Sequence, residues 1–132
     1  MIFKLGDKFK ENFVVTGKVY YGFIKIFRDE NPLHTDDKFA LVKGFKGKVM
    51  HGNILNGFLS YFIGECLPTK DVIIHSQEIQ FKSPVYLEDE LDLIAQVIGI
   101  YESVNVIEFK FYFKSKELKT VAKGKFQIGL IV

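Results

Sequence analysis

Cysteine and tryptophan are almost absent from this sequence, which contains one cysteine, Cys66, and no Trp. A single cysteine excludes an internal disulfide and any metal cluster built on several thiolates, and it is typical of a reducing compartment, so we expect a cytoplasmic protein. Prolines are few and lie far apart, and no linker, repeat or low-complexity tract is visible. We therefore expect a single domain over residues 1–132.

Long apolar runs are also absent. No stretch approaches the roughly 18 residues that would span a bilayer, and the first residues lack the apolar core of about 7–15 residues that a signal peptide needs. We expect neither a membrane anchor nor export. Charge of one sign is not in excess either, because 18 Lys and Arg are interspersed with 16 Asp and Glu. Nucleic acid is therefore not expected as a partner.

Apolar residues make up 48% of the chain and include 14 Phe and 6 Tyr, which excludes disorder and predicts an aromatic-rich core. In the first half, apolar residues spaced by three and four predict a helix over residues 20–27 that ends near Asn31, because Pro32 disfavours helix in the residue before it. A short second helix is expected from Asp36 or Asp37 to about Val42, with Gly44 just past its end.

The run from Asn53 to Leu67 is apolar almost all round and is closed by Pro68, which predicts a helix buried on nearly every side. Gly57 and Gly64 lower helix propensity, so they suggest close approach of another backbone. Downstream, apolar and polar residues alternate, which is typical of half-buried antiparallel strands. Four such strands are expected, over residues 72–81, 91–100, 107–113 and 122–130. Together these elements predict an α+β fold with a sheet around a central helix.

Asp29, Asn31 and His34 fall within six residues, on a turn whose shape Pro32 helps to fix. A carboxylate beside an imidazole is the minimal equipment for general acid–base catalysis near neutral pH. These residues also commonly cap turns and helices, and the spacing alone does not separate the two interpretations. A metal site is not expected, because one His with carboxylates and no second nearby His or Cys is a weak ligand set.

The wider context favours the catalytic interpretation. Asp29-Glu30-Asn31-Pro32-Leu33-His34 is followed by Val49-Met50-His51-Gly52, the apolar helix, Ile79-Gln80-Phe81-Lys82-Ser83-Pro84-Val85 and Asp89-Glu90-Leu91. Over about residues 20–98 this order resembles the MaoC-like hydratases and dehydratases, which include the R-specific enoyl-CoA hydratases.

The resemblance implies a hot-dog fold, a homodimer and no cofactor. It implies hydration of 2-enoyl thioesters to (R)-3-hydroxyacyl thioesters, or the reverse dehydration, with an acyl-CoA or an acyl carrier protein thioester as substrate. Asp29 and His34 would be the catalytic pair and Asn31 a supporting residue. The helix after His51-Gly52 would direct free N–H groups at the thioester carbonyl, with Gly52 or Asn53 as donor.

Two positions depart from the resemblance. Gly57 stands where some members have a serine, and Asn53 replaces a residue that is usually apolar. Gly57 favours one alternative, an acyl-thioester-binding domain without catalysis. A second alternative is an acyl thioesterase, because other hot-dog proteins hydrolyse thioesters with a carboxylate on or near the central helix. Glu65 disfavours it, since this residue, the only acid on the helix, sits at its far end.

From the sequence alone, three further side chains are expected to have structural rather than catalytic roles. His51 is expected to bond backbone near the start of the buried helix. His75 is expected to be a partly exposed sheet residue, and Cys66 an inert core thiol. The lysines between Lys43 and Lys48 are typical of a solvated loop, with contact to a ligand phosphate as the alternative.

Overall fold

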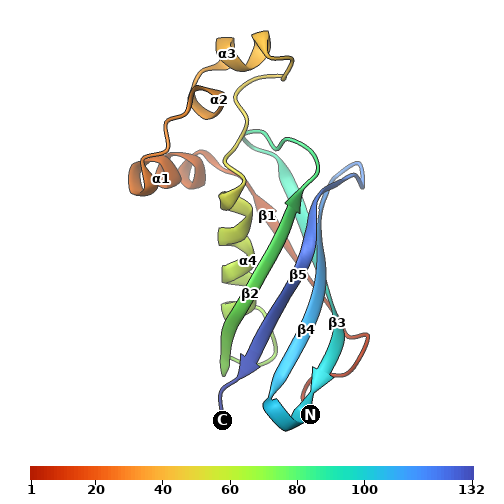
Figure 1. The fold of residues 1–132 in the computed structure, drawn as a ribbon. Helices are drawn as coiled ribbons and strands as arrows, with labels where there is room; N and C mark the ends of the chain where they lie inside the picture. The colour runs from red at the N-terminus through yellow and green to blue at the C-terminus, as the bar shows by residue number, and fades with distance from the viewer.

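The computed structural model describes residues 1–132. Its elements are β1 (Lys8–Val14), α1 (Gly17–Phe27), α2 (Pro32–Thr35), α3 (Asp37–Val42), α4 (Asn53–Glu65), β2 (Val72–Phe81), β3 (Glu90–Tyr101), a 3-10 turn (Glu102–Val104), β4 (Val106–Ser115) and β5 (Thr120–Leu130). The strands form one antiparallel sheet in the order β1-β3-β4-β5-β2. Figure 1 shows α4 lying along one face of the sheet, α1 to α3 gathered at one end and both termini at the other.

The four predicted strands are confirmed, each within one or two residues of its expected ends. In β3 and β4 every second side chain is buried, as the alternation of apolar and polar residues predicts. Burial of one such phenylalanine contributes about 1.5–3 kcal/mol to folding. The inward side chains of these two strands meet α4, and the resulting core includes Leu93, Val97, Phe109, Phe111, Leu59 and Phe62.

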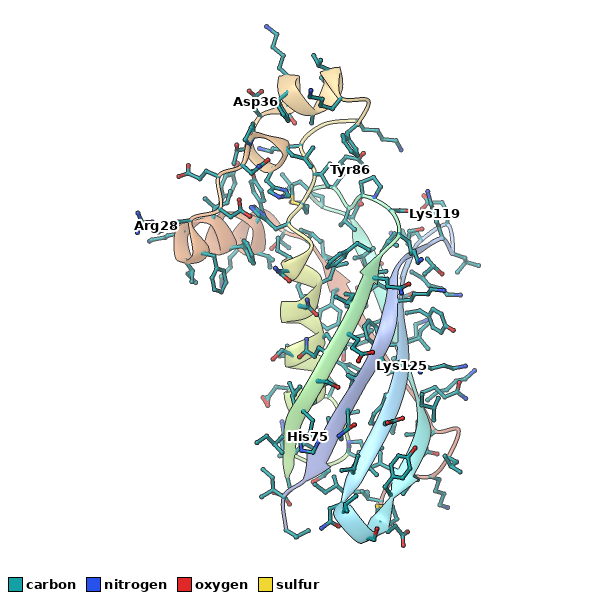
Figure 2. The ribbon with its side chains drawn as sticks, viewed as in Figure 1. Arg28, Asp36, His75, Tyr86, Lys119 and Lys125 are labelled. Carbon is teal, nitrogen blue, oxygen red and sulfur yellow. The ribbon has the colours of Figure 1, made fainter.

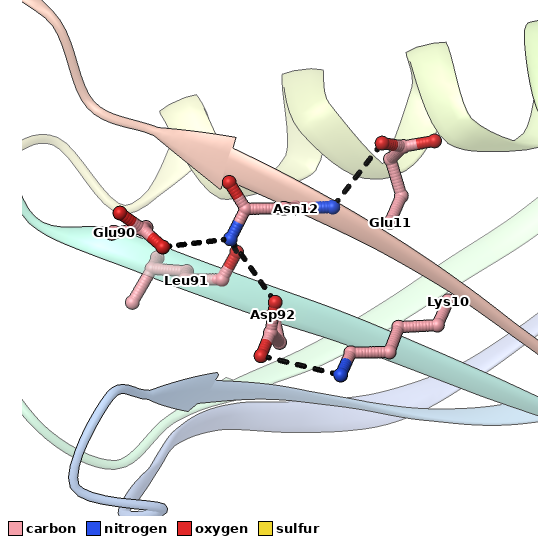
Figure 3. A network of polar contacts seen from close by, with 6 residues as sticks. All are labelled: Lys10, Glu11, Asn12, Glu90, Leu91 and Asp92. Atoms are coloured by element: carbon pink, nitrogen blue, oxygen red, sulfur yellow. Dashed lines mark hydrogen bonds and ion pairs between the residues drawn. The ribbon is translucent and has the colours of Figure 1, made fainter.

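A fifth strand, β1, was not predicted from the sequence. Polar residues Glu11 and Asn12 interrupt its apolar pattern, although Phe9 and Phe13 pack against the core. The strand pairs with β3, and the Asn12 amide adds side-chain bonds across this pair (Figure 3). Its Nδ2 donates to a carboxylate oxygen of Glu90 at 3.3 Å and of Asp92 at 3.1 Å. The edge of the sheet is thereby tied by polar contacts that residue alternation does not show.

The central helix α4 is confirmed, but its expected burial on nearly every side is wrong. Ile54, Leu55, Leu59, Phe62 and Ile63 are buried, whereas the opposite face, with Asn53, Gly57, Ser60 and Tyr61, is exposed in the single chain. The close backbone approach expected at Gly57 and Gly64 is also wrong, because a Cβ at either position would meet no atom within 4 Å. No helix of the structure has the length and apolar character needed to cross a membrane.

Capping side chains define the helices at the end of the sheet. Thr16 starts α1 three residues earlier than expected, accepting a bond from Val19 N–H, and Arg28 ends it in the left-handed conformation. Asp36 caps α3, which confirms the short second helix (Figure 2). Between them, the predicted turn contains a one-turn helix, α2, capped by Asn31. The segment that carries Asp29 and His34 is therefore held by hydrogen bonds at both ends.

Candidate active site

A cavity of about 480 Å³ lies where the α1–α2 connection, the start of α4 and residues 81–85 come together. Two segments of its wall are fixed by main-chain bonds, Met50 N–H to Val85 O at 2.8 Å and Lys82 N–H to Val121 O at 2.8 Å. Four of the six residues singled out from the sequence line the cavity, namely Asp29, His34, Gly52 and Asn53. The other two, Asn31 and Gly57, lie outside it.

His34 lies on α2 and is half buried, with its ring fixed by the main chain on one side. Its Nδ1 lies 2.7 Å from the carbonyl oxygen of Val49. A carbonyl only accepts, so Nδ1 carries the hydrogen, and in the neutral ring Nε2 keeps its lone pair. Tyr20 fixes the main chain, because its hydroxyl donates to the carbonyl oxygen of His34. The ring can therefore accept a proton or a hydrogen bond at Nε2 in the cavity.

Asp29 lies between α1 and α2 and is exposed, as is Asn31. One carboxylate oxygen of Asp29 accepts from Asn31 N–H at 3.2 Å, and the Asn31 side chain accepts from Leu33 N–H at 3.0 Å. These bonds are the ones expected if Asp29 and Asn31 only cap a turn and a helix. They leave the second carboxylate oxygen of Asp29 free for other contacts, so capping and chemistry do not exclude each other. His34 does not cap α3 in this structure, because Asp36 does.

His51 contacts the site more closely than the sequence indicated. Its Nε2 lies 2.8 Å from the main-chain oxygen of Asp29, so the bond expected near the start of α4 instead holds the residue that carries the carboxylate. The ring is 3% exposed and stacks on the ring of His34, with centroids 4.0 Å apart. Its Nδ1 is buried without a partner. No local pattern signals this contact, because the two bonded residues are 22 positions apart.

The ligand-capable atoms of Asp29, His34 and His51 lie within 4.8 Å of one another. A second His is thus near the first, contrary to the premise of the sequence analysis. The rings are stacked with planes only 28° apart, so their in-plane lone pairs lie in nearly parallel planes and do not converge on one point. An ion bound by both imidazoles would need one ring to rotate out of the stack.

The first turn of α4 offers unpaired main-chain donors to the cavity. Gly52 precedes the helix without a side-chain cap, and neither its N–H nor that of Asn53 donates to any protein acceptor. Free N–H groups at a helix start attract an acceptor that carries partial negative charge. Gly52 also allows close packing, because a Cβ there would lie 2.8 Å from the ring of Phe81. Phe81 thus covers the helix start from the β2 side.

A second and wider groove, of about 1020 Å³, runs between α1 and the exposed face of α4 and contains Gly57. The two hollows share Phe23, Asp29, Asn53 and Ile54 in their walls, so they meet beside the Asp29 carboxylate. An elongated ligand could pass from one to the other past this point.

Two groups in the structure have a raised pKa, Tyr20 beside the site and Cys66 at the far end of α4. Burial raises the pKa of the Tyr20 phenol, and the Lys48 ammonium, 5.0 Å from the centre of that ring, offsets part of the shift. Lys48 thus contacts an aromatic ring rather than lying free in the loop that was expected to be solvated.

Cys66 is half buried just past the end of α4, not in the core, and its Sγ lies 3.5 Å from Glu11 Oε2. His75 is exposed on the sheet, as expected, and bonds Gln127.

Comparison with known proteins agrees with this geometry. The chain is 30% identical to a mitochondrial 3-hydroxyacyl-[acyl-carrier-protein] dehydratase of Arabidopsis thaliana over 113 residues, which cover 86% of this chain and 67% of that protein. It is 35% identical to an (R)-specific enoyl-CoA hydratase of Aeromonas caviae over 80 residues, which cover 61% of this chain and 60% of that protein. The aligned segments thus span about two thirds or less of these curated relatives.

The fold matches that of a solved (R)-hydratase from A. caviae, with a TM-score of 0.89, 25% identity and 97% of both chains covered. The sheet wrapped along α4 is therefore the hot-dog fold. A fluoroacetyl-CoA thioesterase shares this fold at a TM-score of 0.67 and 11% identity, so the fold by itself does not define the reaction. Residues 9–118 match the family described as MaoC like domain. The chain belongs to the MaoC like domain family.

Proposed function

We propose that this protein adds water to 2-enoyl thioesters to give (R)-3-hydroxyacyl thioesters, or catalyses the reverse dehydration, as a hydro-lyase. The observation that carries the proposal is that Asp29, with one carboxylate oxygen free of protein bonds, and His34, with Nδ1 bound to Val49 O, line one cavity beside unpaired helix N–H groups. The names of the relatives, which include both hydratases and dehydratases, support this reaction class.

In the proposed hydration, one water lies between Asp29 and His34 and attacks C3 of the enoyl group. Asp29 accepts one proton from this water as the C3–O bond forms, and this proton is then delivered to C2. His34 Nε2 holds the water by accepting a hydrogen bond from its other O–H, which becomes the 3-hydroxyl group. The N–H groups of Gly52 and Asn53 stabilise negative charge on the thioester oxygen as the enolate develops. Dehydration follows the same path in reverse.

The proposed assembly is a homodimer. Its support is the exposed edge of β2, together with the exposed α4 face that carries Asn53, Gly57 and Tyr61 in the single chain. Unpaired strand edges are commonly covered by a second copy, and a helix face beside such an edge can be covered with it. Light scattering on the purified protein measures this directly, and a monomer at micromolar concentration would contradict it.

The test of the reaction uses a short enoyl-CoA, crotonyl-CoA, and follows loss of its conjugated absorbance. Asp29→Asn and His34→Ala should each lower kcat/KM by about 10²–10⁴-fold, the usual contribution of an acid–base group. Matched controls are Asp36→Asn, which keeps a good helix cap outside the cavity, and His75→Ala on the exposed sheet face. If the two site variants hydrate crotonyl-CoA as fast as the controls, the proposed pair is wrong.

Hydrolysis of the thioester receives no support from the site. Glu65, the only acid on α4, lies at the end of the helix away from the cavity and pairs with Lys70 at 3.1 Å. Release of free CoA from crotonyl-CoA or butyryl-CoA, detected with a thiol reagent, would overturn this conclusion. Tight binding of both esters without turnover would instead indicate a binding domain.

A further inference from the structure

Three side-chain amides form a chain of hydrogen bonds between β2 and the exposed face of α4. Gln77 Nε2 donates to the main-chain oxygen of Asn56 at 3.3 Å and to its side-chain Oδ1 at 3.2 Å. Asn56 Nδ2 in turn donates to Asn53 Oδ1 at 3.0 Å. These residues line the groove beside α1, and Asn53 also lines the cavity of the proposed active site.

The orientation of all three amides follows from one main-chain atom. A carbonyl oxygen only accepts, so the group of Gln77 that faces Asn56 O is its NH₂. That NH₂ also faces the Asn56 side chain, which must therefore present Oδ1 to it and its own Nδ2 to Asn53. Asn53 accepts through Oδ1 and turns Nδ2 outward. The NH₂ of Asn53 is consequently a donor with a defined direction.

This donor has no partner within the single chain. Asn53 Nδ2 makes no hydrogen bond to any residue, and it stands at the junction of the two hollows, where Asp29 also lies. Asp29, the other polar residue that lines both hollows, offers a carboxylate, and His34, whose Nε2 is an acceptor in the neutral ring, lies beside it. The junction therefore offers two acceptors and one oriented amide donor.

A water at this junction would match that set of groups. Its two O–H groups donate to Asp29 and to His34 Nε2, one lone pair faces C3 of the enoyl group, and the second lone pair requires a donor. His34 Nδ1–H is already used by Val49 O, and the Gly52 and Asn53 main-chain N–H groups serve the thioester oxygen in the proposed function. Four residues line both hollows, Phe23, Asp29, Asn53 and Ile54, and among them only Asn53 has a side-chain donor.

We propose that the side-chain amide of Asn53, oriented by Asn56 and Gln77, donates a hydrogen bond to the oxygen at C3, which is the attacking water in hydration and the hydroxyl of the 3-hydroxyacyl thioester in dehydration. The inference rests on the proposed function and deepens it. It makes Asn53 a substrate-binding residue, with Asn56 and Gln77 as positioning residues. A saturated acyl thioester, which lacks this oxygen, gains nothing from the Asn53 side-chain amide.

The first test compares binding of (R)-3-hydroxybutyryl-CoA and butyryl-CoA by calorimetry, in the Asp29→Asn protein to suppress turnover. Adding Asn53→Leu should lower the affinity for (R)-3-hydroxybutyryl-CoA by about 5- to 10-fold, which corresponds to the loss of one neutral hydrogen bond. The affinity for butyryl-CoA should change by less than about twofold. Equal weakening of both esters, no weakening of either, or no binding of either ester to the Asp29→Asn protein would overturn the proposal.

The second test addresses the positioning residues with a nearly isosteric change. An aspartate in Asn56→Asp can accept from Gln77 but cannot donate to Asn53 Oδ1, so Asn53 should turn its NH₂ toward residue 56 and away from the junction. We expect the same selective loss of (R)-3-hydroxybutyryl-CoA affinity as in Asn53→Leu, and no further loss in the double variant. Unchanged selectivity in Asn56→Asp would show that the amide chain does not orient Asn53.

The binding measurements separate this inference from the proposed function. If crotonyl-CoA hydration depends on Asp29 and His34 but the two esters respond equally to Asn53→Leu, only the inference fails. If the parent protein does not hydrate crotonyl-CoA but Asn53→Leu still weakens the hydroxy ester selectively, the proposed reaction fails and Asn53 remains a hydroxyacyl-binding residue.

Discussion

His51 and His34 hold their imidazole rings face to face, with centroids 4.0 Å apart and planes 28° apart. The two rings belong to different segments, and each is fixed by a main-chain carbonyl, that of Asp29 for His51 and that of Val49 for His34. The Asp29 segment, α2 and the loop leading into α4 are therefore joined through two rings. The relative position of Asp29 and His34 depends on a residue that touches both.

The first prediction separates the stacking of His51 from its hydrogen bond. His51→Phe keeps a flat ring against His34 but loses the donor to Asp29 O, whereas Gln can place its Nε2 near that of His51. We expect His51→Phe to lower kcat for crotonyl-CoA by about 10- to 100-fold with little change in KM, because small misplacement of reacting groups is costly. His51→Gln should retain most of the activity.

The control for this prediction is the free energy of unfolding in urea. His51→Phe loses one bond but also removes the buried, unpartnered Nδ1, so the two effects offset and stability should change by no more than about 1 kcal/mol. Full activity in His51→Phe, or an equal loss of activity in His51→Gln, would show that the bond to Asp29 does not position the site.

A second prediction concerns Tyr20, which is 1% exposed and donates through its hydroxyl to His34 O. Burial raises its pKa above the ordinary value of about 10, so the folded protein favours the protonated phenol. The contribution of this preference to the free energy of unfolding is fully present below a pH of about 10, the pKa of Tyr20 in the unfolded chain. It is lost as the pH rises through the higher pKa of Tyr20 in the folded protein, because the unfolded chain releases the proton first. Tyr20→Phe should therefore lose less stability at alkaline pH than the parent protein, which is checked by measuring the unfolding midpoint of both as a function of pH. Equal pH dependence in both proteins would contradict the assignment.

The sequence predicted the strands of this fold well because one face of each is buried and the other is not. In β4 the apolar residues Ile107, Phe109, Phe111 and Phe113 alternate strictly, and the register follows. The strand β1 was not predicted because Glu11 and Asn12 take part in polar contacts at the edge of the sheet, where the alternation of apolar and polar residues is weak. The exposed face of α4 was missed because Tyr61 looks apolar in sequence whether a neighbour covers it or not.

The candidate site was predictable only in its local part. Asp29 and His34 lie on one short segment, so their proximity follows from the chain itself. The bond from His51 to Asp29 and the bond from Gln77 to Asn56 join residues 22 and 21 positions apart, respectively. Such contacts depend on how α4 is placed against α2 and β2, which no local pattern encodes. His51 and Asn53 could be named from the sequence, but their partners could not.

A third prediction concerns the thiol of Cys66. Burial raises its pKa, and the nearby Glu11 carboxylate adds to the shift. The thiolate is the reactive form, so the folded protein should react with iodoacetamide at pH 8 more slowly than the chain unfolded in urea. Glu11→Gln removes the charge next to Sγ and should speed the native reaction. A native rate equal to that of the unfolded chain would contradict this account.

The final prediction contrasts two glycines on α4 or at its start. A Cβ at Gly57 meets nothing within 4 Å, so Gly57→Ala should stabilise the protein by about 0.5–1 kcal/mol through helix propensity alone. A Cβ at Gly52 would lie 2.8 Å from the Phe81 ring, which is half exposed and can move aside. Gly52→Ala should therefore cost little stability but displace Phe81 from the helix start and lower kcat/KM for crotonyl-CoA. Adding Phe81→Leu, which frees the space for the new methyl group, should restore part of that loss; if the double variant is no more active than Gly52→Ala, the contact between residue 52 and Phe81 is not the cause.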